Sequence, residues 1–260
     1  MGTTWGVGAY PLMAERLHPA AERAVARAGI RRGDRVIDVA TGTGNAALLA
    51  ADRGAEVVGV DFEPALLAVA NDRAAALGVR VRWETGDATA LGTPDHWAGA
   101  VLSVFGVMYA SDHEAAAREL ARCAAPNAKV VLAAWAPGSL MPDMGRALSD
   151  WLPPPPPSSG PPSRWGDAAA LAAILEPAGL RMTASAVECL SMTFADAHDA
   201  TDFLVRTAGH VVAEQERLVR EGRWTDLLAS LRVLVEARGV HAAGGLRLDC
   251  EYLLATATPA

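Results

Sequence analysis

Lysine is almost missing from this 260-residue chain: of its 23 basic residues, Lys129 is the only lysine. A reaction through a lysine Schiff base would therefore have to use that one side chain. Lys129 stands at the head of "KVVLAAW", which reads as a buried strand. The sequence thus argues against lysine-based covalent chemistry.

Cysteine is scarce as well. The three cysteines, Cys123, Cys189 and Cys250, are scattered and form no CxxC pair. This excludes the usual zinc and disulfide patterns, so we expect no metal site. The cysteines read as small buried residues in a reducing, cytoplasmic compartment.

The chain also lacks a basic cluster and a long apolar run. Its net charge is −7, which disfavours nucleic acid and anionic membranes as partners. The longest uncharged stretch, residues 98–110, is shorter than the roughly 18–20 residues of a membrane span. The start "MGTTWGVGAY" has no signal-peptide pattern. We expect a soluble protein with a small-molecule substrate; a homodimer is left open.

What the first 135 residues do contain is an alternation of strand and helix patterns, which predicts a mostly parallel sheet covered on both faces. The expected strands are 35–40, 55–61, 79–85, 100–105 and 129–135. The expected helices are 14–28, 45–54, 64–78 and 111–125.

After Trp135 the composition changes. Residues 136–166 hold the proline run 153–157 and read as a proline-rich linker, either a spacer or one wall of a substrate opening. Residues 167–260 contain a helix at 167–180, strands at 181–190 and 245–257, and a helical cap at about 194–243. We interpret 1–260 as one domain, with 1–135 as its cofactor-binding core.

The stretch "DVATGTGN" (38–45) joins the first strand to its helix through a glycine turn, which alone fits a dinucleotide-binding fingerprint. Asp38 would repel a pyrophosphate but suits an ammonium group. Asp61 ends the second strand, where an acidic side chain accepts hydrogen bonds from ribose. Phe62 can lie on an adenine, and Asp87 of "GDA" can reach its amino group. The inferred ligand has an adenine, a ribose and a zwitterionic tail.

At this point the chain resembles the class I S-adenosylmethionine-dependent methyltransferases. The resemblance rests on "VIDVATGTGN", "VVGVDFEPALLAVA", "VRWETGDATAL", "VLSVFGVMYASDHEAAAREL" and "VVLAAW", in family order. It is closest to the small-molecule branch, the ubiquinone/menaquinone-type and bacterial natural-product enzymes, whose "RWGD" (164–167) and "EYLLATATP" are also similar. It implies a Rossmann-like α/β fold: a doubly wound, mostly parallel sheet of seven strands, with a C-terminal antiparallel strand and a helical cap insertion.

The resemblance also implies the cofactor S-adenosylmethionine, with S-adenosylhomocysteine as product, and assigns residues to it. The implied cofactor-binding residues are Tyr10, Asp38, Ala40, Gly42, Gly44, Asp61, Phe62, Asp87, Ala88, Ser103 and Phe105. Ser103 and Phe105 would lie where the methyl group meets the substrate. Tyr10 would be a lid residue near the cofactor tail.

Two departures lie in "LGTPDHWAGAVLS", where Ala98 and Gly99 replace the Phe-Asp pair usual in relatives. We expect this to loosen one packing contact and remove one loop carboxylate, while cofactor binding survives. The Asn-Pro-Pro-Tyr signature of adenine and glutamine methyltransferases is absent at "SVFG", which argues against a nucleic-acid target.

Each assignment has a structural alternative. Asp61 could cap the helix at Pro64, Phe62 could belong to the core, and Asp87 could form a turn. Asp112 is expected to cap the next helix. His113, Tyr109 and Tyr10 are weak catalytic candidates, and the remaining histidines read as structural.

Two other functions stay open: an NAD-dependent oxidoreductase, and the same cofactor used for non-methylating chemistry such as a cyclisation. The acceptor is not identified, and neither is the atom that would be methylated. We expect the surface that binds the acceptor to come from residues 1–18, 106–109, 136–166 and 194–243. The aromatic and apolar candidates for it are Met108, Tyr109, Trp135, Trp151, Trp165, Phe203 and Trp224.

Overall fold

A computed structural model describes residues 5–154, 157–242 and 244–260. Contacts divide the chain into two compact units. The sheet unit contains Leu17–Pro137, Pro156–Glu188 and Tyr252–Ala260, and the helical unit contains Met1–Arg16, Gly138–Pro155 and Cys189–Glu251. The predicted cap, about 194–243, lies within the helical unit. Residues 1–4, 155–156 of the proline run, and 243 lie outside the described residues.

The strands form one mixed sheet, in the order β3-β2-β1-β4-β5-β8-β6, and β7 pairs with β8. The strands are β1 (Arg35–Val39), β2 (Glu56–Asp61), β3 (Arg82–Thr85), β4 (Ala98–Val104), β5 (Ala124–Trp135), β6 (Leu180–Phe194), β7 (Val240–Ala242) and β8 (Gly245–Pro259). This confirms the Rossmann-like fold class. The described residues hold eight strands where seven were expected, because β7 is only three residues long and shows no sequence pattern.

The first five strands run parallel and β8 runs antiparallel to β5. Strand order reverses between β1 and β4, which are direct neighbours although β2 and β3 intervene in sequence. Such a reversal opens a crevice at the carboxyl ends of the strands, where this class of sheet binds its ligands. The glycine turn that follows β1 lies at this position.

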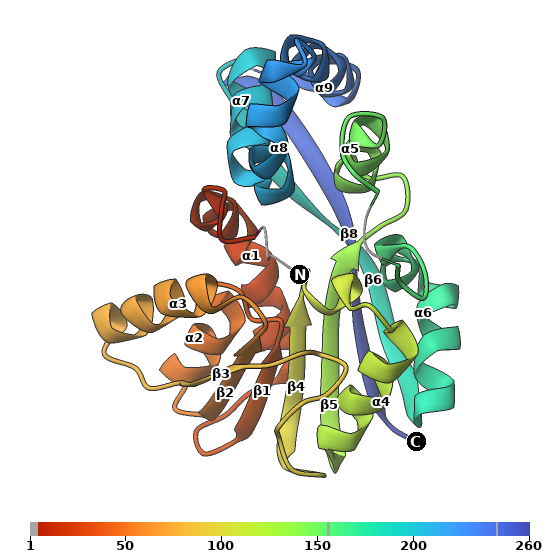
Figure 1. Cartoon of the computed structure of the whole chain (residues 1–260). Helices are drawn as coiled ribbons and strands as arrows, with labels where there is room; N and C mark the ends of the chain where they lie inside the picture. The colour runs from red at the N-terminus through yellow and green to blue at the C-terminus, as the bar shows by residue number, and fades with distance from the viewer. Residues whose placement is uncertain (1–4, 155–156, 243) are drawn as a thin grey trace. The chain divides into compact units, whose positions relative to one another are not determined.

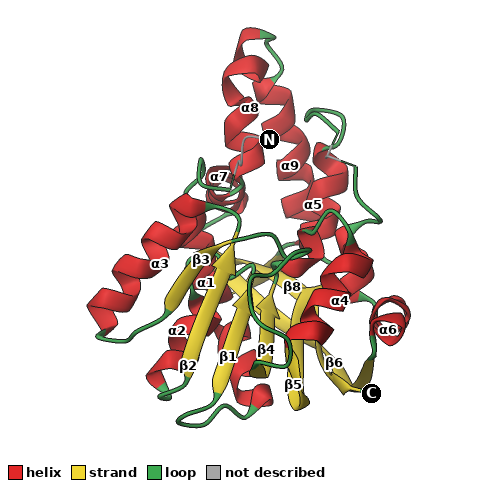
Figure 2. Cartoon of the chain, turned by 60° about the horizontal axis from the view of Figure 1, so that its bottom comes forward, coloured by secondary structure: helices red, strands yellow, loops and turns green. Residues whose placement is uncertain are grey.

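Helices cover both faces of the sheet. The helix α2 (Asn45–Asp52) packs on β1 and β2, and α3 (Pro64–Leu77) packs on β2 and β3. The helix α4 (His113–Cys123) packs on β4, β5 and α6 (Ala168–Leu175). Because crossovers are right-handed and strand order reverses at β1, α2 and α3 lie on one face and α4 on the other (Figures 1 and 2).

Local signals explain the helix ends. Asp112 and Asp167 cap α4 and α6, each accepting a hydrogen bond of 2.8 Å from a backbone N–H three residues on. Gly78, at a φ of 67°, ends α3. The helix α1 (Tyr10–Ala28) starts four residues before the predicted one, and its apolar face is buried as predicted, with Val25 fully buried.

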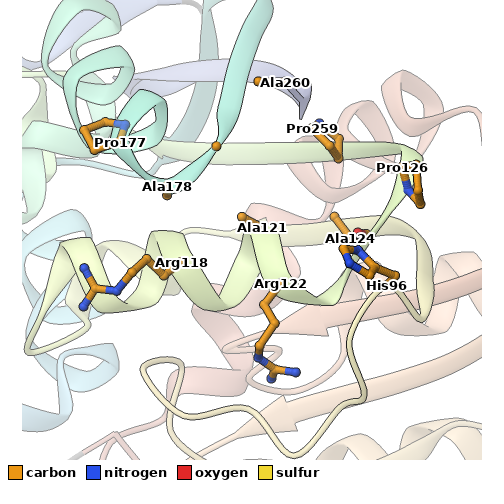
Figure 3. A pocket seen from close by; sticks show the side chains of 11 residues that line it. His96, Arg118, Ala121, Arg122, Ala124, Pro126, Pro177, Ala178, Pro259 and Ala260 are labelled. Atoms are coloured by element: carbon orange, nitrogen blue, oxygen red, sulfur yellow. Dashed lines mark hydrogen bonds between the residues drawn. The ribbon is translucent and has the colours of Figure 1, made fainter.

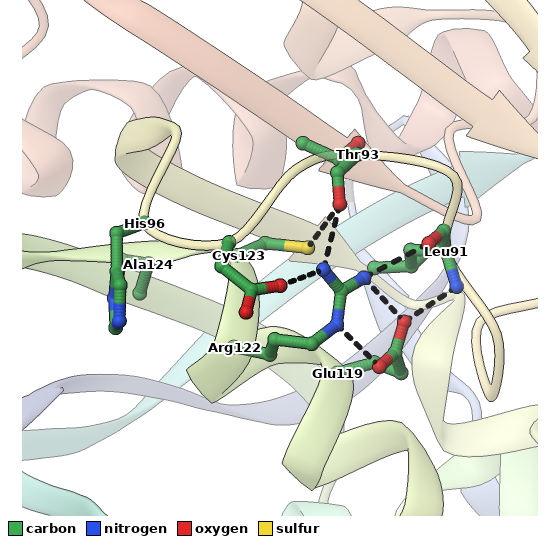
Figure 4. A network of polar contacts seen from close by, with 8 residues as sticks. Leu91, Thr93, His96, Glu119, Arg122, Cys123 and Ala124 are labelled. Atoms are coloured by element: carbon green, nitrogen blue, oxygen red, sulfur yellow. Dashed lines mark hydrogen bonds and ion pairs between the residues drawn. The ribbon is translucent and has the colours of Figure 1, made fainter.

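The loop before β4, just ahead of the departures from the family pattern at Ala98 and Gly99, is held by one arginine. Arg122 of α4 binds both oxygens of Glu119 at 2.7 Å and donates to the carbonyl groups of Leu91 and Thr93 at 2.9 and 2.8 Å (Figure 4). It also pairs with Asp95 at 2.7 Å. This network joins the loop to α4.

In the helical unit, α9 (Trp224–Arg238) contacts α5 (Leu140–Leu148), α7 (Ala197–Thr207) and α8 (Gly209–Arg220). The helix α5 lies within residues 136–166, which the sequence predicts to be a proline-rich linker. Its one proline, Pro142, stands in the first turn, where no backbone hydrogen bond is lost. Asp143 of α5 is buried and pairs with Arg146 and Arg238.

Among the helices of the described residues, none combines the length and the apolar composition needed to cross a bilayer.

Candidate cofactor site

The first element of the site is a buried carboxyl group beneath the glycine turn. Asp38, near the end of β1, is 2% exposed. Its Oδ2 accepts hydrogen bonds from the Thr41 hydroxyl at 2.6 Å and the Ala47 N–H at 3.0 Å. Burial nevertheless raises the pKa of Asp38 to about 7, because desolvation outweighs these two contacts. A cationic ligand group would favour the charged form.

The second element is Asp61 at the end of β2, which is also buried. Its Oδ2 accepts the Gly42 N–H at 2.7 Å and its Oδ1 accepts the Glu63 N–H at 2.9 Å. Burial raises the pKa of Asp61 despite these bonds. The contact with Gly42 joins the glycine turn to β2, and it engages an amide that a dinucleotide phosphate would otherwise use.

A carboxylate offers about four lone-pair positions, so Asp61 retains acceptor capacity beyond its two backbone bonds. Glu63 adds to it. This residue, which no sequence pattern predicts to be part of the site, caps α3 by accepting the Ala65 N–H at 3.4 Å. Its other oxygen, Oε2, is buried and has no partner among the described residues. Glu63, and not Asp61, therefore caps the helix.

The glycine turn is fixed from the opposite side by Arg73 of α3. Its guanidinium donates to the Thr43 carbonyl at 2.6 Å and to the Asn45 side chain at 2.9 Å. Gly44 adopts a φ of 85°, and a Cβ there would lie 2.8 Å from the Trp83 ring. Arg73 and Trp83 were not predicted, because nothing in the local sequence shows that they approach the turn.

Phe62 and the "GDA" segment lie at the ends of β2 and β3. Phe62 is 44% exposed, which is unusual for a phenylalanine and contradicts the alternative that it belongs to the core. Asp87 forms a turn in which Oδ1 accepts from the Thr89 N–H at 2.8 Å and the Thr89 hydroxyl at 2.7 Å. Asp87 is exposed and Ala88 half-buried. The turn involves one carboxylate oxygen of Asp87, so a second role is compatible with it.

The side chains at the end of β4 form hydrogen bonds and packing contacts within the protein. The Ser103 hydroxyl donates to the Val39 carbonyl at 2.7 Å and accepts the Val107 N–H at 3.0 Å. Phe105 is 6% exposed and stacks on Trp135, with ring centroids 3.8 Å apart. These two side chains support the strand end, so a contact with a cofactor would have to come from their backbone.

The ends of β1 and β4 approach each other closely. Ala40 and Phe105 both adopt left-handed backbone conformations, with φ of 54° and 58°. A Cβ at Gly106 would lie 2.5 Å from the Ala40 carbonyl oxygen, so the approach requires glycine there. Strained backbone of this kind concentrates at functional sites.

The three weak catalytic candidates occupy different positions. His113 is 1% exposed, and its ring meets Trp165 edge-on at 5.7 Å. Burial, with the neighbouring Arg164, lowers the pKa of His113, so it is neutral and enclosed. Tyr109 is 44% exposed as a residue, but burial of its hydroxyl raises its pKa to about 12. Tyr10 begins α1 in the helical unit, where it meets Trp5 edge-on.

Two further observations concern metal ligands and a cavity away from this site. No group of three His, Cys, Asp or Glu side chains in the described part of the chain has a geometry suited to a metal ion. A shallow cavity of about 570 Å³ lies between α4 and the end of β8, lined mainly by alanine and proline (Figure 3). It contains none of the predicted site residues. It adjoins the start of β5, whereas the glycine turn lies at the opposite end of the parallel strands.

Comparison with known proteins bears on the family and the fold. A methyltransferase domain model matches residues 36–127. An uncharacterised protein of Mycobacterium tuberculosis is 34% identical over 257 residues, covering 97% of this chain and 92% of that protein. A demethylmenaquinone methyltransferase of Thermus thermophilus is 44% identical over 117 residues, covering 44% of this chain and 53% of that enzyme. The solved structure of the YcgJ protein from Bacillus has a TM-score of 0.67 at 19% identity, covering 93% of this chain and 98% of that one.

Proposed function

The chain belongs to the class I S-adenosylmethionine-dependent methyltransferases, in the branch that acts on small molecules, and we propose that it methylates a secondary metabolite or a quinone-like compound. The observation that carries the proposed cofactor site is the pair of buried carboxyl groups, Asp38 and Asp61, at the glycine turn. The partial match with a demethylmenaquinone methyltransferase supports a quinone-like acceptor.

The charge of the turn supports a cofactor with an ammonium end. Asp38 is buried with its pKa raised to about 7, and Asp61 is bonded to the Gly42 N–H. A pyrophosphate at this place would meet two carboxyl groups, while an ammonium group would stabilise the ionised form of Asp38. We therefore assign Asp38 to the methionine ammonium group, directly or through water, and the backbone of Ala40, Gly42 and Gly44 to the methionine part.

The ends of β2 and β3 suit the nucleoside. Asp61 keeps acceptor capacity for ribose hydroxyl groups. Glu63, two residues further along the chain, is also buried, and its Oε2 has no partner among the described residues. Phe62 exposes a ring that can lie against adenine, and Asp87 with Ala88 can read its amino edge. We propose this set as the cofactor site; the lid role of Tyr10, which belongs to the helical unit, stays a prediction from the sequence.

When bound, S-adenosylmethionine supplies a methyl group that its sulfonium centre activates for in-line displacement. The chain then has to orient the acceptor and exclude water. We assign this task to the loop Phe105–Asp112 after β4, here called the acceptor loop. Tyr109 keeps its proton at neutral pH, so it can position the acceptor but not act as a base. His113 is enclosed, which argues against its acting as a base on the acceptor.

The test uses methyl-labelled S-adenosylmethionine and a panel of phenols, hydroquinones and amines, with products analysed by mass spectrometry. We expect a product heavier than its acceptor by one labelled methyl group in place of hydrogen. A product of unchanged mass would instead favour cofactor-assisted cyclisation. Oxidation of an acceptor at the expense of NAD, without label transfer, would favour the oxidoreductase alternative.

A further inference from the structure

The segment Ser159–Gly166 contacts the acceptor loop at Ser111 and at Val107–Tyr109, and it includes most of the "RWGD" motif. Both segments belong to the sheet unit. We propose that this segment is a positioning clamp that holds the acceptor loop in the conformation needed for methyl transfer; the inference rests on the proposed function. The clamp would determine how well the acceptor is oriented, without contributing to cofactor binding.

The first contact of the clamp is Ser159. Its N–H donates to the Ser111 carbonyl at 3.0 Å, and its hydroxyl oxygen accepts the His113 N–H at 2.7 Å. These two partners flank Asp112, the residue that caps α4. One serine therefore fixes the backbone on both sides of the point where the acceptor loop becomes helix.

The second contact is an ion pair. Arg164 lies 3.0 Å from Glu114 in the first turn of α4, and it also donates to the Ser159 carbonyl at 3.1 Å. Arg164 thus links the two ends of the clamp to each other and to the helix. The pair is partly exposed, so its geometric role outweighs its contribution to stability.

The third contact is close packing of the clamp against β5. Trp165 is 1% exposed, and Gly166 packs so closely on the Trp135 carbonyl that a Cβ there would overlap it. On the other side, the Trp135 ring stacks on Phe105, the first residue of the acceptor loop. The clamp is therefore connected to the acceptor loop at both of the loop's ends.

This packing carries a cost that points to a function. The indole nitrogen of Trp165, which packs against the His113 ring, is buried without a hydrogen bond among the described residues. Unsatisfied buried polar groups destabilise a fold and are rare in native proteins. A contact of apolar side chains would give a more stable seat, so stability alone does not explain the pair.

The experiment compares Ser159→Ala and Arg164→Ala with the control Ser149→Ala, whose exposed hydroxyl donates to the Arg146 carbonyl in the helical unit. Amide hydrogen exchange is measured at Val107, Tyr109 and Ala110, which are hydrogen-bonded in the acceptor loop. We expect both clamp variants to speed exchange there by about tenfold relative to the control, since local opening governs exchange.

Two further readouts separate positioning from general stability. Affinity for S-adenosylhomocysteine should stay within about twofold of the wild type, while the acceptor's kcat/KM falls by about tenfold. Exchange that is unchanged, or that rises uniformly over the chain, would overturn the clamp. If the wild-type chain does not bind S-adenosylhomocysteine, the proposed function fails, and the exchange comparison still decides whether the clamp exists.

Discussion

Replacing Asp61 with alanine tests the ribose assignment. The variant loses a carboxylate that would accept hydrogen bonds from two ribose hydroxyl groups, each worth roughly 1.5–3 kcal/mol because the acceptor is charged. Even the lower value for both bonds, about 3 kcal/mol, predicts at least a hundredfold loss of affinity for S-adenosylhomocysteine. His113→Ala should change this affinity by less than about threefold, because His113 packs on Trp165 and contacts no predicted cofactor residue.

The assay is isothermal titration calorimetry with S-adenosylhomocysteine on both variants. Asp61→Ala also leaves the Gly42 and Glu63 N–H groups without their acceptor, so it should lower the free energy of unfolding by about 1–3 kcal/mol for each group. Thermal unfolding must therefore be recorded, and the titrations run well below both midpoints. Equal losses of affinity in the two variants would refute the ribose assignment.

Three more outcomes follow. Affinity for S-adenosylhomocysteine should rise by about tenfold per pH unit up to pH 7 and then level off, because an ammonium group binds the ionised form of Asp38, whose pKa is about 7. The measurement is calorimetry from pH 5.5 to 8.5. A flat profile, or the same slope in Asp38→Asn, would contradict this prediction. Without ligand, rising pH acts in the opposite direction, on the stability of the fold. Asp38 keeps its proton up to about pH 7 in the folded state, against 3.8 for a free side chain, so the free energy of unfolding falls as pH rises between these two values. Asp38→Asn removes the ionisable group and should therefore raise Tm at pH 8. Gly44→Ala should destabilise more than Gly33→Ala by about 1–3 kcal/mol in urea unfolding, because both have φ near 85° but only Gly44 meets Trp83; equal costs would remove Trp83 from the account.

The cofactor half of the fold could be predicted because its signals are local. Asp38 and Asp61 stand at strand ends that the apolar pattern of β1 and β2 fixes, and the glycine turn follows directly after β1. Residues that reach the site from elsewhere carry no such signal. Arg73 and Trp83 act across the sheet surface, and Glu63 is hidden because Asp61 competes for the same capping role.

The second half was harder to predict for a different reason. Proline dominates the composition of residues 136–166, yet α5 and the turn Pro162–Gly166 both form there, since Pro142 and Pro162 occupy first-turn positions that tolerate proline. The "RWGD" motif resembled a family feature without indicating its partners. Those partners, Trp135, Glu114 and His113, are far away in sequence and become apparent only in the folded sheet unit.

The most direct test of the central claim is a parallel calorimetric titration of the wild-type chain with S-adenosylhomocysteine and with NADH. The two buried carboxyl groups at the glycine turn predict binding of S-adenosylhomocysteine and no measurable heat with NADH. Binding of NADH without binding of S-adenosylhomocysteine would contradict the account.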